Sequence, residues 1–340
     1  MNKDPALGPA PRRVVLDTDT ANEIDDQFAL AWALLAPEAI ALEAVHAAPF
    51  SHGVYFSALA AACAERGGPA SRWEHFAHSM DAEARTKLLA DTPPERGMER
   101  SFEEILRVFE AAGVAPGERV KRGSAGFLPG PRTPVESEAA WDLIRLARTA
   151  SPEAPIEVAI IGAPTNVASA LLLEPSIAPC LHVRFLAGHA SGAGLPDDSF
   201  NLVQDRYASN VLLESDVPLF YLPGYGVAET LQLSLPDVEA WVRGRGALGD
   251  LLYEIYTHNP IAPNFAEPGR SWIIWDMIAT ASLINPDWLS SRTVPRAHVD
   301  GGHVWRSGPE ASRTMTEAYR VDRNAVMIDF AARLEANEKT

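Results

Sequence analysis

The sequence is poor in cysteine, in basic residues and in long apolar runs. Only 2 of its 340 residues are cysteines, Cys63 and Cys180, so no disulfide framework can form and a reducing compartment is expected. The 29 Lys and Arg residues are outnumbered by 45 Asp and Glu residues, and the net charge of −16 argues against a nucleic-acid partner. No apolar run approaches the roughly 18 residues of a membrane span, and the polar, Pro-rich N-terminus lacks the apolar core of a signal peptide. The sequence therefore predicts a cytoplasmic protein that binds neither nucleic acid nor membrane.

Short apolar runs alternate with longer helical patterns along the chain. Apolar side chains recur at Ile24, Phe28, Trp32 and Leu35, which is the spacing of one helix face. Such alternation is typical of an α/β protein in which helices cover both faces of a mostly parallel sheet. We therefore expect a single domain over residues 12–335, with an open, Rossmann-like sheet and an active site at the carboxyl ends of its strands. The expected strands are 14–16, 39–47, 157–161, 182–187 and 218–222, and the expected helices are 24–36, 55–66 and 137–150.

Residues outside this alternating pattern carry three further expectations. The polar stretch 67–100 is expected to be the loosest part of the chain. A helical insertion near residues 235–270 is expected to form a flap that closes over the site. The lid residues of this flap would be Tyr253, Tyr256, His258 and Asn259. The flexible termini are expected at residues 1–11 and 336–340.

The most informative segment is the stretch 17–26, which holds five carboxylates and no cation. Asp17 and Asp19 leave the end of a strand two residues apart and can project to one side, while Asp25 and Asp26 begin a helix. The helix dipole offsets only about 0.3–1 kcal/mol per charge, which is too little for several converging carboxylates. A bound divalent cation would relieve the repulsion, and all-oxygen ligands with this mixed loop and helix geometry favour Ca²⁺ over Mg²⁺. The alternative is a solvated acidic turn that caps the helix.

This segment is one of four motifs that resemble those of the nucleoside hydrolases of the inosine-uridine type. The four occur in the family's order and together span about residues 12–285. The loop inside the first motif is longer than usual, and it carries Asn22 and Glu23 in place of a Pro-Gly type turn. The motifs are Asp17-Thr18-Asp19 with Asp25-Asp26, the turn Ile161-Gly162-Ala163-Pro164-Thr165-Asn166-Val167-Ala168, Phe200-Asn201 with Asp205, and Trp275-Asp276-Met277-Ile278-Ala279.

The resemblance implies an N-ribohydrolase activity on a nucleoside, a bound Ca²⁺ and a homodimer or homotetramer. Cleaving an N-glycosidic bond develops oxocarbenium character on the sugar and requires a water nucleophile on one face. In the implied mechanism Ca²⁺ positions and acidifies that water and chelates the ribose hydroxyls, and Asp19 accepts the proton as the catalytic base. The implied Ca²⁺ ligands are Asp19, Asp26, the backbone carbonyl of Thr165 and Asp276. The candidate substrate contacts are Asp25, Asn201, Asn22 and Ser199, and Asp17 would support the loop.

The leaving-group side departs from the inosine-uridine pattern. Trp275 stands where that group commonly has a His as general acid, which is similar to the purine-preferring relatives, in which a Trp forms half of an aromatic sandwich. Stacking there raises the basicity of the purine ring so that solvent can protonate it, which implies a catalytic role for Trp275. The alternative is a core indole. Candidates for the second half of the sandwich are Trp73, Phe50 and Tyr225, and rival general acids are His258, His189 and His52.

Two ribose contacts of the family are also replaced. Ser199 stands where a Glu that binds the 5′-hydroxyl is usual, and Ser51 stands where a ribose-binding Asn is common. Their loss beside an intact metal set predicts hydrolysis of a purine or modified ribonucleoside. A calcium-dependent binding protein without turnover and a hydrolase of a non-nucleoside N-glycoside are the open alternatives within the family. Outside it, the alternative is a haloacid-dehalogenase-like phosphatase with Asp17 as nucleophile and Mg²⁺ as cofactor.

Overall fold

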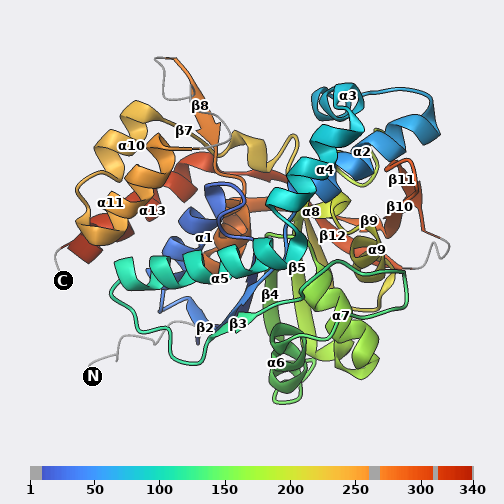
Figure 1. The fold of residues 1–340 in the computed structure, drawn as a ribbon. Coiled ribbons are helices and arrows are strands. Elements are labelled where there is room, and N and C mark those ends of the chain that lie inside the picture. The colour runs from blue at the N-terminus through green and yellow to red at the C-terminus, as the bar shows by residue number, and fades with distance from the viewer. Residues whose placement is uncertain (1–9, 260–268, 309–312, 339–340) are drawn as a thin grey trace.

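The computed structural model describes residues 10–259, 269–308 and 313–338, and its centre is an eight-stranded sheet (Figure 1). The strands follow the order β3 (Val120–Arg122), β2 (Ile40–Ala47), β1 (Arg12–Thr18), β4 (Ile156–Ile160), β5 (Leu181–Ala187), β6 (Leu219–Pro223), β12 (Thr314–Val321) and β9 (Leu289–Pro295). Neighbouring strands run parallel except β9, which pairs antiparallel with β12. Two small antiparallel pairs lie outside this sheet, β7 (Gln232–Ser234) with β8 (Ser271–Ile273) and β10 (Ala297–Val299) with β11 (Trp305–Ser307). The expected mostly parallel sheet is confirmed.

Helices cover both faces of the sheet (Figure 1). They are α1 (Asp25–Leu34), α2 (His52–Arg66), α3 (Arg72–Ser79), α4 (Ala82–Asp91), α5 (Pro94–Ala111), α6 (Glu138–Ala147), α7 (Thr165–Leu173), α8 (Phe200–Val203), α9 (Arg206–Glu214), α10 (Leu235–Trp241), α11 (Gly246–Thr257), α12 (Met277–Ile284) and α13 (Arg323–Glu338). Because alternate side chains of a strand point to opposite faces, Val14 and Leu16 of β1 pack in one hydrophobic core and Val15 packs in another. The helices α1, α5, α12 and α13 contribute to the first core, and α2, α6, α7 and α9 contribute to the second. This arrangement confirms the expected α/β class.

The strand order changes direction between β1 and β4. From β1 the chain moves outward to β2 and β3 on one side, and β4, β5 and β6 continue on the other. In doubly wound sheets of this kind, ligands bind in the crevice outside the strand ends at the point of reversal. Asp19 directly follows β1, and Gly162 lies just beyond β4, so near that a Cβ on Gly162 would meet the Asp19 nitrogen at 2.9 Å. The fold therefore places Asp19 at the reversal point.

Most of the polar stretch 67–100 is helical, with α3 at 72–79, α4 at 82–91 and the start of α5 from 94, and no residue of α4 is buried. Helix α3 begins with a capping box in which Ser71 and Glu74 each bond the other's backbone N–H. The Asp81 side chain caps α4 by accepting from the Ala84 nitrogen at 2.7 Å. These polar residues give the segment its hydrophilic composition, yet they serve as helix caps.

The expected insertion contains α10 and α11, and residues 260–268 lie outside the described residues. Tyr256 is fully buried, and its hydroxyl donates to the Leu233 carbonyl at 2.6 Å. This tyrosine is a core residue, so the expectation of a lid residue is wrong there. Helix α13 continues to Glu338, beyond the expected end of the domain at residue 335. Within the described residues, no helix combines the length and the apolar character that crossing a bilayer requires.

Candidate active site

A cavity of about 530 Å³ opens over the carboxyl ends of β1, β4, β5 and β6. These four strand ends contribute Asp19, Ile161, Ala187 and Gly224 to its lining. The lining carboxyl groups are Asp19, Glu23, Asp25, Asp26, Asp198 and Asp276, and the lining aromatic side chains are Tyr55, Phe56, Trp73, Phe200, Tyr225, Trp272 and Trp275. The sheet therefore brings these carboxyl groups and these aromatic side chains, here called the aromatic wall, into one cavity. The cavity lies at the strand ends, where the sequence predicts the active site.

A tight turn brings the acidic residues of the first motif together. After β1 the Asn22 nitrogen donates to the Asp19 carbonyl at 2.9 Å. Ala21 lies within this turn at a φ of 76°, in the left-handed region that residues with a side chain rarely adopt. The Arg100 guanidinium donates to the Ala21 carbonyl at 3.3 Å. The turn reverses the chain so that Asp25, at the start of α1, lies beside the end of β1.

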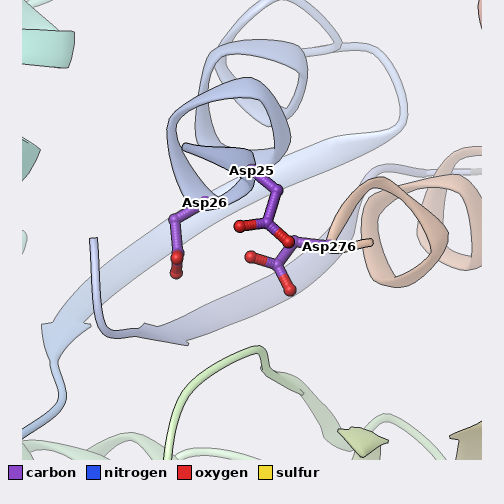
Figure 2. A group of neighbouring side chains, drawn as sticks. All are labelled: Asp25, Asp26 and Asp276. Atoms are coloured by element: carbon purple, nitrogen blue, oxygen red, sulfur yellow. The ribbon is translucent and has the colours of Figure 1, made fainter. Parts of the chain in front are cut away.

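Three buried carboxyl groups converge at the cavity. Oxygen atoms of Asp25, Asp26 and Asp276 all lie within 4.8 Å of one another. Figure 2 shows Asp25 and Asp26 on the first turn of one helix and Asp276 beside a second helix, with the carboxyl groups of Asp25 and Asp276 turned toward each other. Burial raises the pKa of Asp25 to about 7, and burial together with the Asp25 carboxylate raises the pKa of Asp276 well above its usual range. Three acids in this state require either protons or a cation.

Asp19 supplies a fourth carboxyl group near this cluster. It is buried, and burial and the carboxylates of Asp26 and Asp25 raise its pKa well above the usual range. Its Oδ2 atom is buried and has no hydrogen-bond partner among the described residues. A buried acceptor without a donor is costly, and a hard cation would satisfy it as it neutralises the neighbouring charges. The residues present therefore fit a divalent cation with oxygen ligands.

Asp17 and Thr165 lie behind the cavity rather than in its lining. Asp17 is buried and accepts a hydrogen bond from the Asn166 amide at 3.0 Å, and burial raises its pKa to about 7. Thr165 begins α7, and its hydroxyl donates to the Asp205 carboxylate at 2.7 Å. Asp17 therefore links the end of β1 to α7, and Thr165 links the start of α7 to Asp205.

The four candidate substrate contacts all line the cavity: Asn22, Asp25, Ser199 and Asn201. The Asn201 amide nitrogen donates to the Ile161 carbonyl at 2.8 Å and to the Leu186 carbonyl at 3.2 Å, which fixes the side chain and leaves its oxygen for a ligand. The hydroxyl of Ser199 is buried without a hydrogen-bond partner in the described structure. Both groups can therefore accept a bond from a bound hydroxyl.

Trp275 lies in the aromatic wall, with its ring edge-to-face against Tyr225 at 5.8 Å. Of the other two expected sandwich partners, Trp73 lines the cavity and Phe50 does not. Phe50 is buried, with the Arg100 guanidinium 5.4 Å above its ring.

Of the three histidines considered as general acids, only His52 lines the cavity. Burial and the nearby Arg100 charge lower the pKa of His52, so it is neutral near pH 7. Ser51, just before it, caps α2 by accepting from the Val54 nitrogen at 3.2 Å and does not line the cavity. His52 is therefore the one candidate general acid of the three that lines the cavity, and Ser51 serves as the N-cap of α2.

The sequence does not reveal the contribution of Asp198. Its carboxylate lines the cavity and accepts from the Tyr225 hydroxyl at 2.8 Å. The adjacent Asp197 has a different task, because its carboxylate accepts from the backbone nitrogens of His189 and Ser199 and from the Trp305 indole, at 2.7–2.9 Å. The only available signal is an acidic pair separated by Ser199 from the Phe200-Asn201 motif.

Solved structures with the same fold are nucleoside hydrolases. The chain aligns over 96% of its length with 99% of the plant nucleoside hydrolase PpNRh1, at a TM-score of 0.65 and 15% identity. It aligns over 96% of its length with 99% of a purine-preferring ribonucleoside hydrolase from Gardnerella vaginalis, at a TM-score of 0.64 and 17% identity. The protein therefore has the nucleoside hydrolase fold.

The sequence match narrows this class to one family. Residues 14–336 match the profile of the inosine-uridine preferring nucleoside hydrolases, and the chain belongs to this family. It is 31% identical over 163 residues, 46% of the chain, to the pyrimidine-specific ribonucleoside hydrolase RihB of Escherichia coli O1:K1, of which the match covers 49%. An equally similar protein from Shigella boydii serotype 4 is covered over 63% of its length. The chain thus spans less than two thirds of these curated relatives, and the resemblance seen in its motifs is confirmed at the level of the family.

Proposed function

We propose that the protein hydrolyses the N-glycosidic bond of a purine or modified ribonucleoside and releases the free base and ribose. The observation that carries this proposal is the single cavity in which a buried carboxyl cluster faces an aromatic wall at the strand ends. The acidic side suits a sugar with several hydroxyls, and the aromatic side suits a flat heterocycle. Membership of the family and its fold support the same reaction.

We assign a Ca²⁺ ion to the carboxyl groups of Asp19, Asp26 and Asp276, and the resemblance to the family adds the backbone carbonyl of Thr165, a residue that does not itself line the cavity. The buried cluster of carboxyl groups and the unpartnered Oδ2 atom of Asp19 support this assignment, since hard cations prefer such oxygen ligands. When bound, the cation would lower the pKa of a coordinated water and offset the negative charge of the cluster.

The chain's own residues then divide the remaining tasks. Asp19 accepts the proton of the attacking water as general base. Asp25 and the Asn201 oxygen accept hydrogen bonds from the sugar hydroxyls, and Asn22 and Ser199 extend this set. Asp17 supports the loop through its bond with Asn166.

Trp275 acts on the leaving base. Its indole would stack on the heterocycle and favour protonation of a ring nitrogen by solvent, with Tyr225 holding the indole from its edge. The neutral state of His52 near pH 7 disfavours this histidine as the proton donor. The aromatic wall supports a large purine base, whereas the relative RihB is named a pyrimidine-specific ribonucleoside hydrolase. The substrate panel below therefore includes purine and pyrimidine ribosides.

The test is reducing-sugar release from purine, pyrimidine and modified ribosides with calcium-loaded protein. Asp19→Asn should lower kcat by about 10²–10⁴-fold, the range for loss of a general base, with its melting curve still cooperative. Asp287→Asn is the matched control, because Asp287 is exposed in a surface turn and should leave kcat unchanged. Binding of ribosides without release by the wild type would identify a binding protein instead, and phosphate release from phosphomonoesters would identify the phosphatase.

We also propose a cytoplasmic enzyme that works as a homodimer or homotetramer. Both cysteines are free thiols, which is compatible with a reducing compartment. Light scattering in solution tests the oligomeric state directly.

A further inference from the structure

The cavity carries acidic groups that are not balanced by basic ones. Among the described residues that line it there are six carboxyl groups, and there is neither Lys nor Arg. The guanidinium of Arg100 lies outside the lining, over the Phe50 ring and bonded to the Ala21 carbonyl. Asp25, Asp26 and Asp276 form the cluster that a cation would neutralise, and Asp19 and Glu23 lie close enough that the charges of Asp25 and Asp26 raise the pKa of both. Asp198 does not belong to that cluster, and its charge needs a separate explanation.

Asp198 is held firmly in the aromatic wall. Its Oδ1 atom accepts from the Tyr225 hydroxyl at 2.8 Å, and its backbone carbonyl accepts from the Tyr55 hydroxyl at 2.7 Å. Its Oδ2 atom has no hydrogen-bond partner among the described residues and is not sealed from the cavity. Tyr225 in turn contacts Trp275, so a carboxylate oxygen lies one residue away from the indole that faces the base.

The surrounding side chains form a continuous aromatic surface. Tyr55 lies 5.0 Å from Phe56 between ring centroids, and Phe56 lies 6.4 Å from Trp73 at the edge of the cavity. Aromatic faces attract cations through their quadrupole, and an ionised carboxylate adds to that attraction. In the same wall the hydroxyls of Tyr55 and Tyr225 already donate to Asp198, and His52, the only lining histidine among the described residues, is neutral near pH 7, so no cationic acid faces a leaving base.

We propose that this wall selects N-ribosides whose heterocycle carries a positive charge, such as pyridinium or N-alkylated purine ribosides, and that Asp198 determines this selectivity. The proposal deepens the proposed function and rests on it for the hydrolytic step. It also predicts rejection of nucleotides, because a phosphate would meet six carboxyl groups and neither Lys nor Arg among the described residues that line the cavity.

A cationic heterocycle resolves the lack of a general acid. When water attacks C1′ and the bond from C1′ to the ring nitrogen breaks, the bonding electron pair returns to the heterocycle and cancels its charge. The products are ribose, a neutral base and one proton, which comes from the water. No proton needs to be delivered to the leaving group, so a wall whose tyrosine hydroxyls already donate to Asp198 is sufficient.

The experiment separates binding from turnover. Binding of 1-methylnicotinamide, a cation, is compared with binding of 3-methylbenzamide, its neutral isostere, by titration of tryptophan fluorescence. Hydrolysis of nicotinamide riboside is compared with that of inosine and uridine, with a pH indicator to detect the released proton. The wild type should bind the cation about tenfold more tightly, a difference of about 1.4 kcal/mol, and should release one proton for each nicotinamide riboside cleaved.

Asp198→Asn keeps the acceptor for Tyr225 and removes the charge. It should abolish the binding preference and lower kcat/KM for nicotinamide riboside about tenfold, with kcat/KM for inosine changed less than twofold. Asp216→Asn removes an exposed charge outside the cavity and should change neither value. Tyr225→Phe, a second variant, should retain the preference because the charge of Asp198 remains.

Equal binding of the two probes by the wild type, or an equal loss for all substrates in Asp198→Asn, would overturn the proposal. An equal loss would make Asp198 a general hydrogen-bond acceptor. A cation preference in the absence of any hydrolysis would support the inference about the wall and contradict the proposed hydrolytic function.

Discussion

Replacing Asp276 with Asn should stabilise the protein without its metal and remove its response to calcium. Asp276 is 3% exposed, and one of its carboxyl oxygens lies within 4.8 Å of one oxygen of Asp25 and one of Asp26. Two unit charges at that distance repel by about 3.5 kcal/mol at an effective dielectric constant of about 20. Partial protonation already relieves some of this repulsion, because burial raises the pKa of Asp276. We therefore expect the free energy of unfolding of the metal-free variant at pH 8 to rise by about 1–3 kcal/mol.

Urea denaturation with and without calcium measures both parts of this prediction. For the wild type, calcium at a hundredfold excess over its Kd should add about 2.7 kcal/mol, and Asp276→Asn should gain almost nothing. Asp287→Asn, an exposed charge change in a surface turn, should behave as the wild type. The reasoning is refuted if Asp276→Asn is less stable than the metal-free wild type, or if calcium stabilises both proteins equally.

Burial raises the pKa of Glu157, but the His182 hydrogen bond and the charge of Arg184 outweigh it and lower this pKa from 4.5 to about 2. The stabilisation by Glu157 is therefore complete above about pH 4.5 and is lost as the pH falls toward 2. Glu157→Gln should cost about 3–5 kcal/mol at pH 7 by leaving the buried Arg184 unpaired, and equal urea curves at pH 7 would contradict this. Gly188→Ala should lower the free energy of unfolding by about 3 kcal/mol, because the new Cβ would lie 1.8 Å from the Asp197 carboxylate; a change in melting temperature below 1 °C would disprove the close contact. Ala21→Gly should raise that free energy by about 0.5 kcal/mol by relieving the left-handed backbone, and the β-branched Ala21→Val should lower it by more than about 1 kcal/mol; the opposite order in denaturation would refute the strain.

The central strands could be predicted because each is a short apolar run bounded by a turn residue. Residues Val14–Leu16 lie inside β1, and the run at 182–187 lies inside β5. The position of the acidic loop could be predicted because the loop directly follows the first strand, and ligands bind at the strand ends of doubly wound sheets. These features depend on residues that are neighbours in the sequence.

The helices of 67–100 were hidden by their composition. Helix α5 does carry a periodic apolar face, with Met98, Ile105 and Phe109 buried at spacings of seven and four residues. The charged residues around that face make the mean hydropathy of the segment low, which hides the apolar face. In α3 the signal was the Ser71 and Glu74 capping box, which composition alone does not show.

The separate tasks of Asp197 and Asp198 could not be predicted from sequence. The two residues are chemically identical, and their tasks differ because their partners differ. Asp197 bonds Trp305, which is distant in the chain, and Asp198 bonds Tyr225. Which of two adjacent acids faces a cavity depends on these long-range contacts, and no local pattern encodes them.

One part of the aromatic wall belongs to a section of the chain that can change independently of the carboxyl cluster. The carboxyl cluster is tied to β1, α1 and α12 at the centre of the fold, where a substitution disturbs the main core. Three of the seven lining aromatic side chains, Tyr55, Phe56 and Trp73, come from residues 52–91, an excursion in which α2 and α4 approach so closely that a Cβ on Gly53 would meet Leu89 at 2.3 Å. Directed evolution can therefore reshape this part of the wall with the carboxyl cluster inherited unchanged, whereas Trp275, which directly precedes Asp276, is tied to the cluster itself.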